Sequence, residues 1–272
     1  MHIEQQLYIK NKYMIFFQKD KKTDLFNPDK NLSELANEFE TDKGTADKMQ
    51  LSWGNWSAQS ENEFKYLDTW GYTTVYERYM QKYRSEEVSL LEIGVCDNRC
   101  PFASPKMWAS YFKNADLYAV DNFWGDKLEN RSKEIEYINS VGVNFIYADQ
   151  NSSSDWDEIE KIIPSNSLDF IIEDGSHYPH HMMYTLYRSI KLLKSGGIYF
   201  MEDIQNPKTS KGYWGYDNSN ILINMLFFSL NNKIPTEYID KTLLDEIESN
   251  FTIKELYLDK NSLNYLSVLQ KK

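Results

Sequence analysis

Cysteine is scarce in this chain of 272 residues, which contains only Cys96 and Cys100. Two cysteines are too few for the disulfide framework that stabilises small secreted proteins, so they favour a reduced, intracellular protein. The opening residues Met1–Gln5 also lack the basic-then-apolar pattern of a secretion signal. We therefore expect a cytoplasmic location.

Long apolar runs and an excess of basic residues are missing as well. The apolar segment Tyr13–Phe17 is far too short to span a bilayer, so no membrane span is expected. The chain carries 30 lysines and arginines against 41 aspartates and glutamates, a formal net charge of −11. Because a phosphate backbone is bound by a basic face, nucleic acid is not the expected partner. An anionic small molecule bridged by a cation is still compatible with this charge.

Glycine-rich phosphate-binding motifs are also absent. The predicted strand Val88–Val95 breaks at Gly94, but the dinucleotide-binding glycine fingerprint is incomplete there, and the chain has no P-loop Lys-Ser/Thr pair. A helix is predicted at Ser104–Phe112, with Pro105 in its first turn. Strand, glycine turn and helix in this order favour a nucleotide-like ligand at the turn.

Two short apolar segments that end in acidic residues organise the rest of the chain. They are Leu168–His177 and Gly196–Asp203, and a helical pattern over His180–Leu193 separates them. The order strand, helix, strand predicts parallel neighbours in a sheet covered on both faces. Ligands of such sheets lie beyond the carboxyl ends of the strands. Four side chains are expected to converge there: Asp174, His177, Glu202 and Asp203.

These four side chains have the composition of a metal site with a base beside it. Three carboxylates select a hard cation such as Mg²⁺ rather than Zn²⁺, because no cysteine or second histidine completes a softer ligand set. His177 follows Asp174 by three residues on a turn, so its imidazole is placed to take a proton near neutral pH. A histidine after a strand also occurs in purely structural roles, so the residue pattern allows a base or a structural histidine at this position.

Two further predicted strands end in polar residues. Leu117–Val120 ends at Asp121, which suits the hydroxyl pair of a ribose and equally suits a cap on the next helix. Asn144–Ala148 ends at Asp149 and Gln150, where an adenine amino group could be read. Both strand ends are compatible with a nucleotide-like ligand.

Three polar segments are predicted to be loops. Thr41–Thr45 is dominated by turn residues and, on composition, is a solvated surface connection. Leu51–Glu63 is rich in tryptophan, serine and asparagine and suits a lid over the site. Gln205–Asp217 is a long loop beside the acidic residues, and it suits the wall that binds an acceptor molecule.

The remaining segments complete the prediction of an α/β fold. Ile253–Tyr257 and Leu263–Leu269 alternate apolar and polar residues, which is typical of an antiparallel hairpin. Asn31–Phe39 is a short amphipathic helix that Asn31 or Ser33 would cap. The expected fold is a Rossmann-like parallel sheet with a terminal antiparallel hairpin and a small N-terminal helical extension. The predicted domain boundary lies between residues 65 and 66.

Five motifs together resemble those of class I S-adenosylmethionine-dependent methyltransferases. Within that class they look like the metal-dependent O-methyltransferases that modify macrolide sugars, of the mycinamicin type. The motifs are Thr41–Gly44, Gly71–Thr73, Leu91–Val95, Asp174–His177 and Gly197–Asp203. The resemblance covers about Leu32 to Leu269, and its most specific part is the Asp-Gly-Ser-His motif together with the Glu-Asp pair.

This resemblance implies an enzyme that uses S-adenosylmethionine and Mg²⁺ to methylate a sugar hydroxyl of a saccharide, nucleotide sugar or glycosylated metabolite. It implies His177 as the general base and leaves open whether His180 or His181 shares that role. It also implies a homodimer or homotetramer. The implied metal ligands are Asp174, Glu202 and Asp203. The implied cofactor-binding residues are Thr41, Lys43, Glu92, Gly94, Asp121, Asp149, Gln150 and Asp174, with the loop at Thr41 closing over the cofactor.

Two other functions compete with this one. A NAD-dependent oxidoreductase would share the Rossmann-like sheet, but the incomplete glycine fingerprint and the terminal hairpin argue against it. A non-catalytic Rossmann-like binding module would keep the fold without turnover, and the intact acidic group with His177 argues against that. Binding of S-adenosylhomocysteine, with no binding of NAD, would distinguish a methyltransferase from the oxidoreductase.

Overall fold

The chain forms two compact units, Met1–Ala148 and Asp149–Lys272, in a computed structural model. The structure describes residues 6–10, 13–17, 25–41, 43, 71–95, 102–125, 128–205, 241–258 and 264–272. Within these ranges, none of the helices combines the length and the apolar character that crossing a bilayer requires. The predicted domain boundary between residues 65 and 66, the predicted lid at 51–63 and residues 206–217 of the predicted acceptor wall lie outside the described residues.

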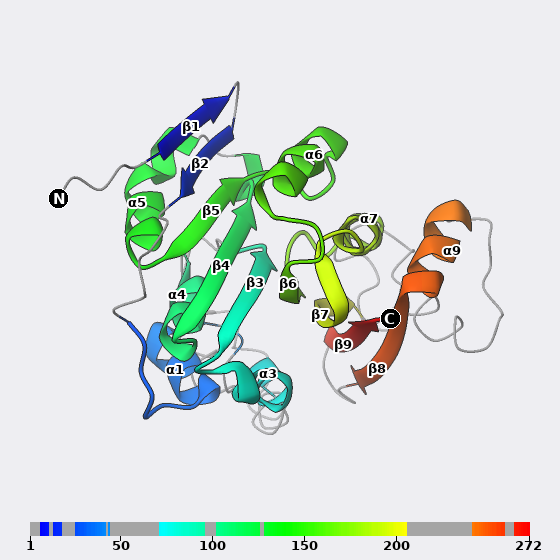
Figure 1. Ribbon diagram of the computed structural model, residues 1–272, viewed down its shortest axis with the longest axis horizontal. Helices are drawn as coiled ribbons and strands as arrows, with labels where there is room; N and C mark the ends of the chain where they lie inside the picture. Colours follow the sequence, from blue (N-terminus) through cyan, green and yellow to red (C-terminus); the bar gives the residue numbers. More distant parts are fainter. Residues whose placement is uncertain are drawn as a thin grey trace, which may run out of the picture. The chain divides into compact units, whose positions relative to one another are not determined.

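The first unit is a sheet of strands in the order β1-β2-β5-β4-β3, drawn in Figure 1. Strands β3, β4 and β5 are parallel, and β2 and β1 extend the sheet in antiparallel pairing from β5. Its strands are β1 (Gln6–Lys10), β2 (Tyr13–Phe17), β3 (Glu87–Ile93), β4 (Asn114–Asp121) and β5 (Val143–Tyr147). Its α-helices are α1 (Leu32–Phe39), α3 (Tyr72–Met80), α4 (Ala103–Tyr111) and α5 (Ser132–Ser140), and its short 3₁₀ turns are η3 (Gln81–Tyr83), η4 (Phe123–Gly125) and η5 (Leu128–Arg131).

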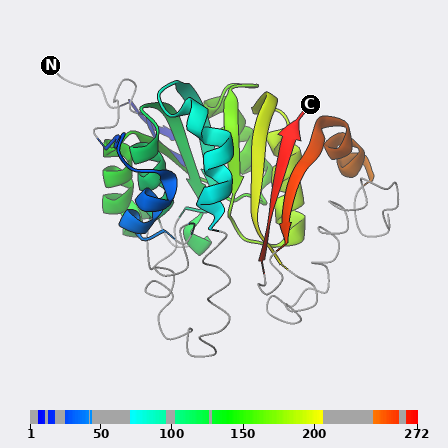
Figure 2. The ribbon, with the colours of Figure 1, turned by 90° about the horizontal axis from the view of Figure 1, so that it is seen from below.

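Local sequence explains where the first helices begin and what they bury. Asn31 caps α1, because its side chain accepts from the Glu34 backbone N–H while the Glu34 carboxylate accepts from the Asn31 N–H. Figure 2 shows α1 and α3 side by side over the strands of this unit. The buried residues of these helices include Tyr76 of α3 and Trp108 of α4, whose rings meet edge to face at a centroid distance of 5.7 Å.

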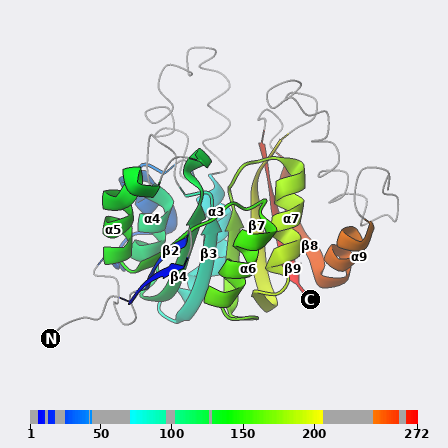
Figure 3. The same ribbon diagram turned by 90° about the horizontal axis from the view of Figure 1, so that it is seen from above.

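The second unit has strands in the order β6-β7-β9-β8. β6 and β7 are parallel, and β9 and β8 add the predicted antiparallel hairpin beside β7. The strands are β6 (Leu168–Glu173), β7 (Leu193–Gln205), β8 (Phe251–Leu258) and β9 (Asn264–Lys271), and the helices are α6 (Ser153–Ile162), α7 (Pro179–Ser189) and α9 (Lys241–Asn250). Helix α7 contacts β6 and β7, and Figure 3 shows it against the sheet of this unit. It begins at Pro179, shortly after β6 ends at Glu173.

The predicted parallel strands and the terminal hairpin are confirmed, with two differences. The N-terminal extension, predicted as helical, also contains the strands β1 and β2, because short apolar stretches there complete the edge of a sheet. The crossover helix ends at Ser189, and β7 begins at Leu193 instead of Gly196, because Leu193 already pairs with Leu168 of β6.

The Tyr199 hydroxyl on β7 gives a stability prediction. Its side chain is fully buried, and the hydroxyl has no hydrogen-bond partner among the described residues. Burial and the nearby Glu173 charge raise the pKa of Tyr199, so the unmatched group stays a protonated donor. We expect Tyr199→Phe to raise the free energy of unfolding by about 1 kcal/mol in urea denaturation, since an unmatched buried hydroxyl costs about 1–3 kcal/mol.

Tyr111→Phe is the matched control for this prediction. Tyr111 is equally buried, but its hydroxyl donates to Glu77 Oε1 at 2.9 Å. The control is expected to lower the unfolding free energy by about 1–2 kcal/mol, because the lost bond has a charged acceptor. A loss of stability in both variants would contradict the prediction for Tyr199.

Candidate metal and transfer site

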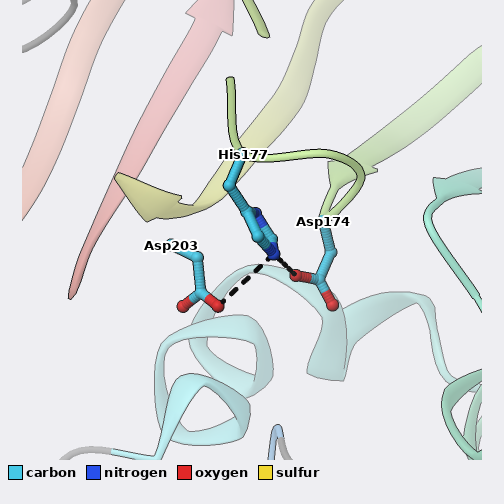
Figure 4. A group of neighbouring side chains, drawn as sticks. All are labelled: Asp174, His177 and Asp203. Carbon is cyan, nitrogen blue, oxygen red and sulfur yellow. Dashed lines mark ion pairs between the residues drawn. The ribbon is translucent and has the colours of Figure 1, made fainter. Parts of the chain in front are cut away.

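The Asp174–His177 turn follows β6, and Asp203 lies near the end of the neighbouring parallel strand β7. The carboxyl ends of adjacent parallel strands meet at one edge of a sheet, so the two segments are brought together as predicted. Figure 4 shows the His177 imidazole directed between the two carboxylates. His177 Nε2 lies 3.9 Å from Asp174 Oδ1 and 3.8 Å from Asp203 Oδ2.

This arrangement of Asp174, His177 and Asp203 fits a divalent cation. One ligand atom from each residue lies within 4.8 Å of the others, and all three side chains are only partly buried. Two carboxylate oxygens are hard donors that suit Mg²⁺ and Mn²⁺, whereas an imidazole is a softer donor. The imidazole therefore has two possible roles at the same position, as a base beside the cation or as one of its ligands.

The backbone at the two ends of this group is unusual. His177 has φ 58° and Asp203 has φ 51°, both in the left-handed region that most residues avoid. At Asp203 the pairing of β7 with β9 also shifts register between Met201 and Ile204. Such an irregularity re-aims a side chain that a regular strand would direct elsewhere. The local backbone, together with the turn, therefore sets where the two side chains point.

Glu202 is placed differently from its neighbour. Its side chain is 1% exposed, and among the described residues the candidate metal group contains Asp174, His177 and Asp203 without it. The predicted role of Glu202 as a metal ligand stays a prediction.

The three histidines of this segment have different surroundings. His177 Nδ1 is buried without a hydrogen-bond partner among the described residues, so Nε2 is the nitrogen available to a reacting group. His181 Nδ1 is hydrogen-bonded to Ser176 Oγ at 2.7 Å. The side chain of His180 lies outside the described residues. His177 is therefore the histidine whose geometry suits the predicted base.

A second set of predicted site residues lies in the first unit, around Glu92 of β3. Glu92 and Lys43 are each 1% exposed, and Lys43 Nζ lies 3.5 Å from Glu92 Oε1. Trp108 Nε1 donates to Glu92 Oε2 at 3.0 Å. Burial raises the pKa of Glu92, while the charge of Lys43 opposes that rise. The composition of the Thr41–Thr45 loop indicated a solvated turn, and the buried side chain of Lys43 contradicts this for that residue.

The glycine turn and Asp121 are joined by hydrogen bonds. The Gly94 N–H donates to Val120 O, and Gly94 has φ 83°, which glycine adopts without a steric penalty. Asp121 accepts from the backbone N–H of Val95 at 2.8 Å and of Phe123 at 2.6 Å. The carboxylate thus bridges two turns, as the capping alternative proposed, and its predicted contact with a ribose stays a prediction.

The other predicted cofactor residues are hydrogen-bonded within the protein. Thr41 is buried, and its hydroxyl accepts from the Lys43 N–H at 3.5 Å. Asp149 accepts from the Asn151 N–H at 2.8 Å. Gln150 is buried and bonded to the segment that leads from β6 into α7. Their contacts with a cofactor stay predictions.

Comparison with known proteins gives relatives of one kind. No family model matches the chain. It is 31% identical over 153 residues to the 8-demethyl-8-alpha-L-rhamnosyl tetracenomycin-C 2'-O-methyltransferase of Streptomyces olivaceus, covering 54% of this chain and 36% of that protein. It is 29% identical over 136 residues to the mycinamicin VI 2''-O-methyltransferase of Micromonospora griseorubida, covering 49% of this chain and 31% of the relative. The chain thus spans about a third of the length of these curated relatives.

The structure matches that of MycE, a methyltransferase from the mycinamycin biosynthetic pathway solved in complex with Mg and SAH. The TM-score is 0.59 at 22% identity, over 89% of this chain and 55% of MycE. The fold is that of a class I methyltransferase. A second MycE structure, which also contains mycinamycin VI, matches equally well. In the class I methyltransferase fold of this chain, the Asp174–His177 turn follows a parallel strand and the hairpin of β8 and β9 ends the sheet.

Proposed function

We propose that this chain is an S-adenosylmethionine-dependent and divalent-metal-dependent O-methyltransferase that acts on a sugar hydroxyl. The acceptor class is a saccharide, nucleotide sugar or glycosylated metabolite, and His177 is the general base. The observation that carries the proposal is the convergence of His177 Nε2 with Asp174 and Asp203 oxygens at the strand ends of a class I methyltransferase fold. A cytoplasmic homodimer or homotetramer belongs to the same proposal.

The comparisons support this class of reaction. The sequence relatives described above methylate sugar hydroxyls according to their names, and the solved MycE structures hold Mg together with SAH. The two carboxylates and the imidazole of this chain are the donor set that such a cation would need. No described feature favours the NAD-dependent oxidoreductase or the non-catalytic binding module.

The residues divide the work of the reaction between them. A sugar hydroxyl is a poor nucleophile because its proton is held far above neutral pH, so the site must take up a proton and align the reacting atoms. When bound, S-adenosylmethionine supplies a methyl group on a good leaving group, and a cation lowers the pKa of a hydroxyl that it contacts. Asp174 and Asp203 would hold the cation and orient the acceptor. His177 Nε2 would accept the hydroxyl proton.

Titration calorimetry with S-adenosylhomocysteine tests the proposal directly. We expect binding with a Kd of about 1–100 μM, a range typical of enzyme ligands, and none with NAD. Mn²⁺ binding, followed by electron paramagnetic resonance, is expected to be abolished by EDTA. Failure of the protein to bind S-adenosylhomocysteine, with or without Mg²⁺, would overturn the proposed function.

Asp203→Asn is the matched variant for the metal part of this test. Asparagine has the same shape as aspartate and tolerates the left-handed φ of this position, so only the charge changes. The affinity for Mn²⁺ is expected to fall more than about 10-fold, since even the loss of a residue that only hydrogen-bonds to a metal ligand costs about 10- to 100-fold. S-adenosylhomocysteine should bind as in the wild type. Unchanged Mn²⁺ affinity would remove Asp203 from the metal site.

A further inference from the structure

Gln150 lies beneath the turn that carries His177, and its side-chain amide is fully engaged there. The side chain is 7% exposed. Its Nε2 donates to Glu173 Oε1 at 3.0 Å and to Thr185 Oγ1 at 3.1 Å, and its Oε1 accepts from the Ser176 N–H at 2.6 Å. Both N–H donors are therefore used inside the protein, and the oxygen that would accept from an adenine amino group already accepts from Ser176.

The turn is fitted closely around this amide. A Cβ added at Gly175 would lie 1.9 Å from Gln150 Oε1, a distance that atoms do not reach. Gln150 cannot move aside cheaply, because three hydrogen bonds hold it in a buried position. Glycine at this position thus allows the backbone of the turn to pack directly against the Gln150 side chain.

Ser176 is held from its other side by helix α7. Its hydroxyl is hydrogen-bonded to His181 Nδ1 at 2.7 Å and accepts from the Tyr178 N–H at 3.4 Å. The Tyr178 ring meets the His181 ring edge to face, with centroids 5.2 Å apart. The backbone of Ser176 is therefore fixed by Gln150 and its side chain by His181.

The residue that follows this double attachment is His177, with its left-handed φ of 58°. A non-glycine residue persists in that region at a cost of about 1–3 kcal/mol only where its surroundings dictate it. We propose that Gln150, with the Ser176–His181 hydrogen bond, positions His177 by enforcing this backbone conformation. This inference deepens the proposed function and relies on it for its kinetic readout. Gln150 is then a positioning residue of the transfer site and not a cofactor ligand.

Gln150→Met tests this role, because methionine keeps the length and bulk of the side chain but cannot bond to Ser176. We expect kcat to fall about 10- to 100-fold, as small misplacements of reacting groups do, while the Kd for S-adenosylhomocysteine stays within about threefold of wild type. Ser189→Ala is the matched control. It removes a different buried polar group of the second unit, a hydroxyl that donates to Leu186 O. It should leave kcat unchanged.

The opposing outcomes are distinct. An unchanged kcat in Gln150→Met would overturn the inference. A preserved kcat together with binding of S-adenosylhomocysteine weakened more than about 10-fold would also overturn it, because the variant would then have lost cofactor binding energy and not the position of His177. If Gln150→Met does not fold, Ser176→Ala takes its place, because it removes the hydroxyl that bonds to His181 and Tyr178 and keeps the backbone N–H that bonds to Gln150. A fall in kcat at unchanged cofactor affinity supports the inference, and an unchanged kcat overturns it.

Failure of the proposed function would be recognised separately, from wild-type protein that does not bind S-adenosylhomocysteine. In that case hydrogen exchange of the Ser176 amide reads the positioning alone. Exchange more than about 10-fold faster in Gln150→Met than in wild type and Ser189→Ala would support the attachment of the turn, since protection reports local opening. Equal exchange in the three proteins would overturn it.

Discussion

Replacing His177 by asparagine is expected to lower the rate of methyl transfer about 100- to 10,000-fold, the range that general acid–base catalysis contributes. Asparagine is chosen because it tolerates the left-handed φ of His177, so the turn keeps its conformation while the imidazole is lost. The affinity for S-adenosylhomocysteine should stay near the wild-type value, since His177 Nε2 faces the two carboxylates. Transfer of a labelled methyl group to an accepted saccharide measures the rate, and calorimetry measures the affinity.

The same variant separates the two roles that the geometry allows for the imidazole. If His177 is the base, Mn²⁺ affinity is retained in His177→Asn and added imidazole restores part of the rate. If His177 is a metal ligand, Mn²⁺ affinity falls together with the rate. A near-normal rate would exclude both roles. His177→Ala, run in parallel, shows how much of the effect comes from backbone strain instead of lost chemistry.

Replacing Lys43 by methionine is expected to lower the free energy of unfolding by about 3–5 kcal/mol at neutral pH, because it leaves a buried carboxylate without its counter-charge. Glu92 and Lys43 are almost completely buried, and their charged atoms lie 3.5 Å apart. The Lys43 carbonyl also accepts from the Thr73 N–H, so the backbone of Lys43 is joined to the start of α3. Urea denaturation measures the change.

The pH dependence of this loss has a definite sign. Burial raises the pKa of Glu92 above its ordinary 4.5, so the stability linked to its proton is full below that pH and is lost as pH rises through the folded value. Removing Lys43 takes away the charge that opposes this rise. The penalty of Lys43→Met should therefore be smallest below pH 4.5 and grow as the pH increases.

The double variant Lys43→Met with Glu92→Gln is the control. It removes both charges, and replacing both members of a buried pair is often neutral for stability. Recovery of most of the lost stability would attribute the effect to the unpaired charge. A double variant as unstable as Lys43→Met alone would show that the packing of the lysine chain, and not its charge, stabilises the loop.

The sequence was sufficient for the parallel strand pair and the terminal hairpin of the second unit, and for part of the site. Apolar segments that end in acids mark strand ends, and parallel neighbours bring those ends together, so Asp174, His177 and Asp203 were predicted to converge and do so. This prediction requires only that the two strands run parallel, which the alternation of strands and helices indicates.

Side-chain direction is the part that the sequence could not reveal. Glu202 and Asp203 are adjacent on β7, and the register shift near them, which leaves no mark in the residue types, accompanies one buried and one partly exposed carboxylate. Gln150 follows a strand end as a ligand-binding residue would, but it points into the interior toward Ser176. Lys43 pairs with Glu92, which lies 49 residues later in the chain, and loop composition carries no information about such a partner.

The left-handed backbone at His177 and Asp203 has a consequence for the evolution of the chain. Glycine at either position would relieve this strain, while removing a side chain to which the proposed function assigns a role in turnover. Selection for heat resistance alone would therefore tend to replace these two side chains. Under the proposed function, the two positions trade thermal robustness for activity.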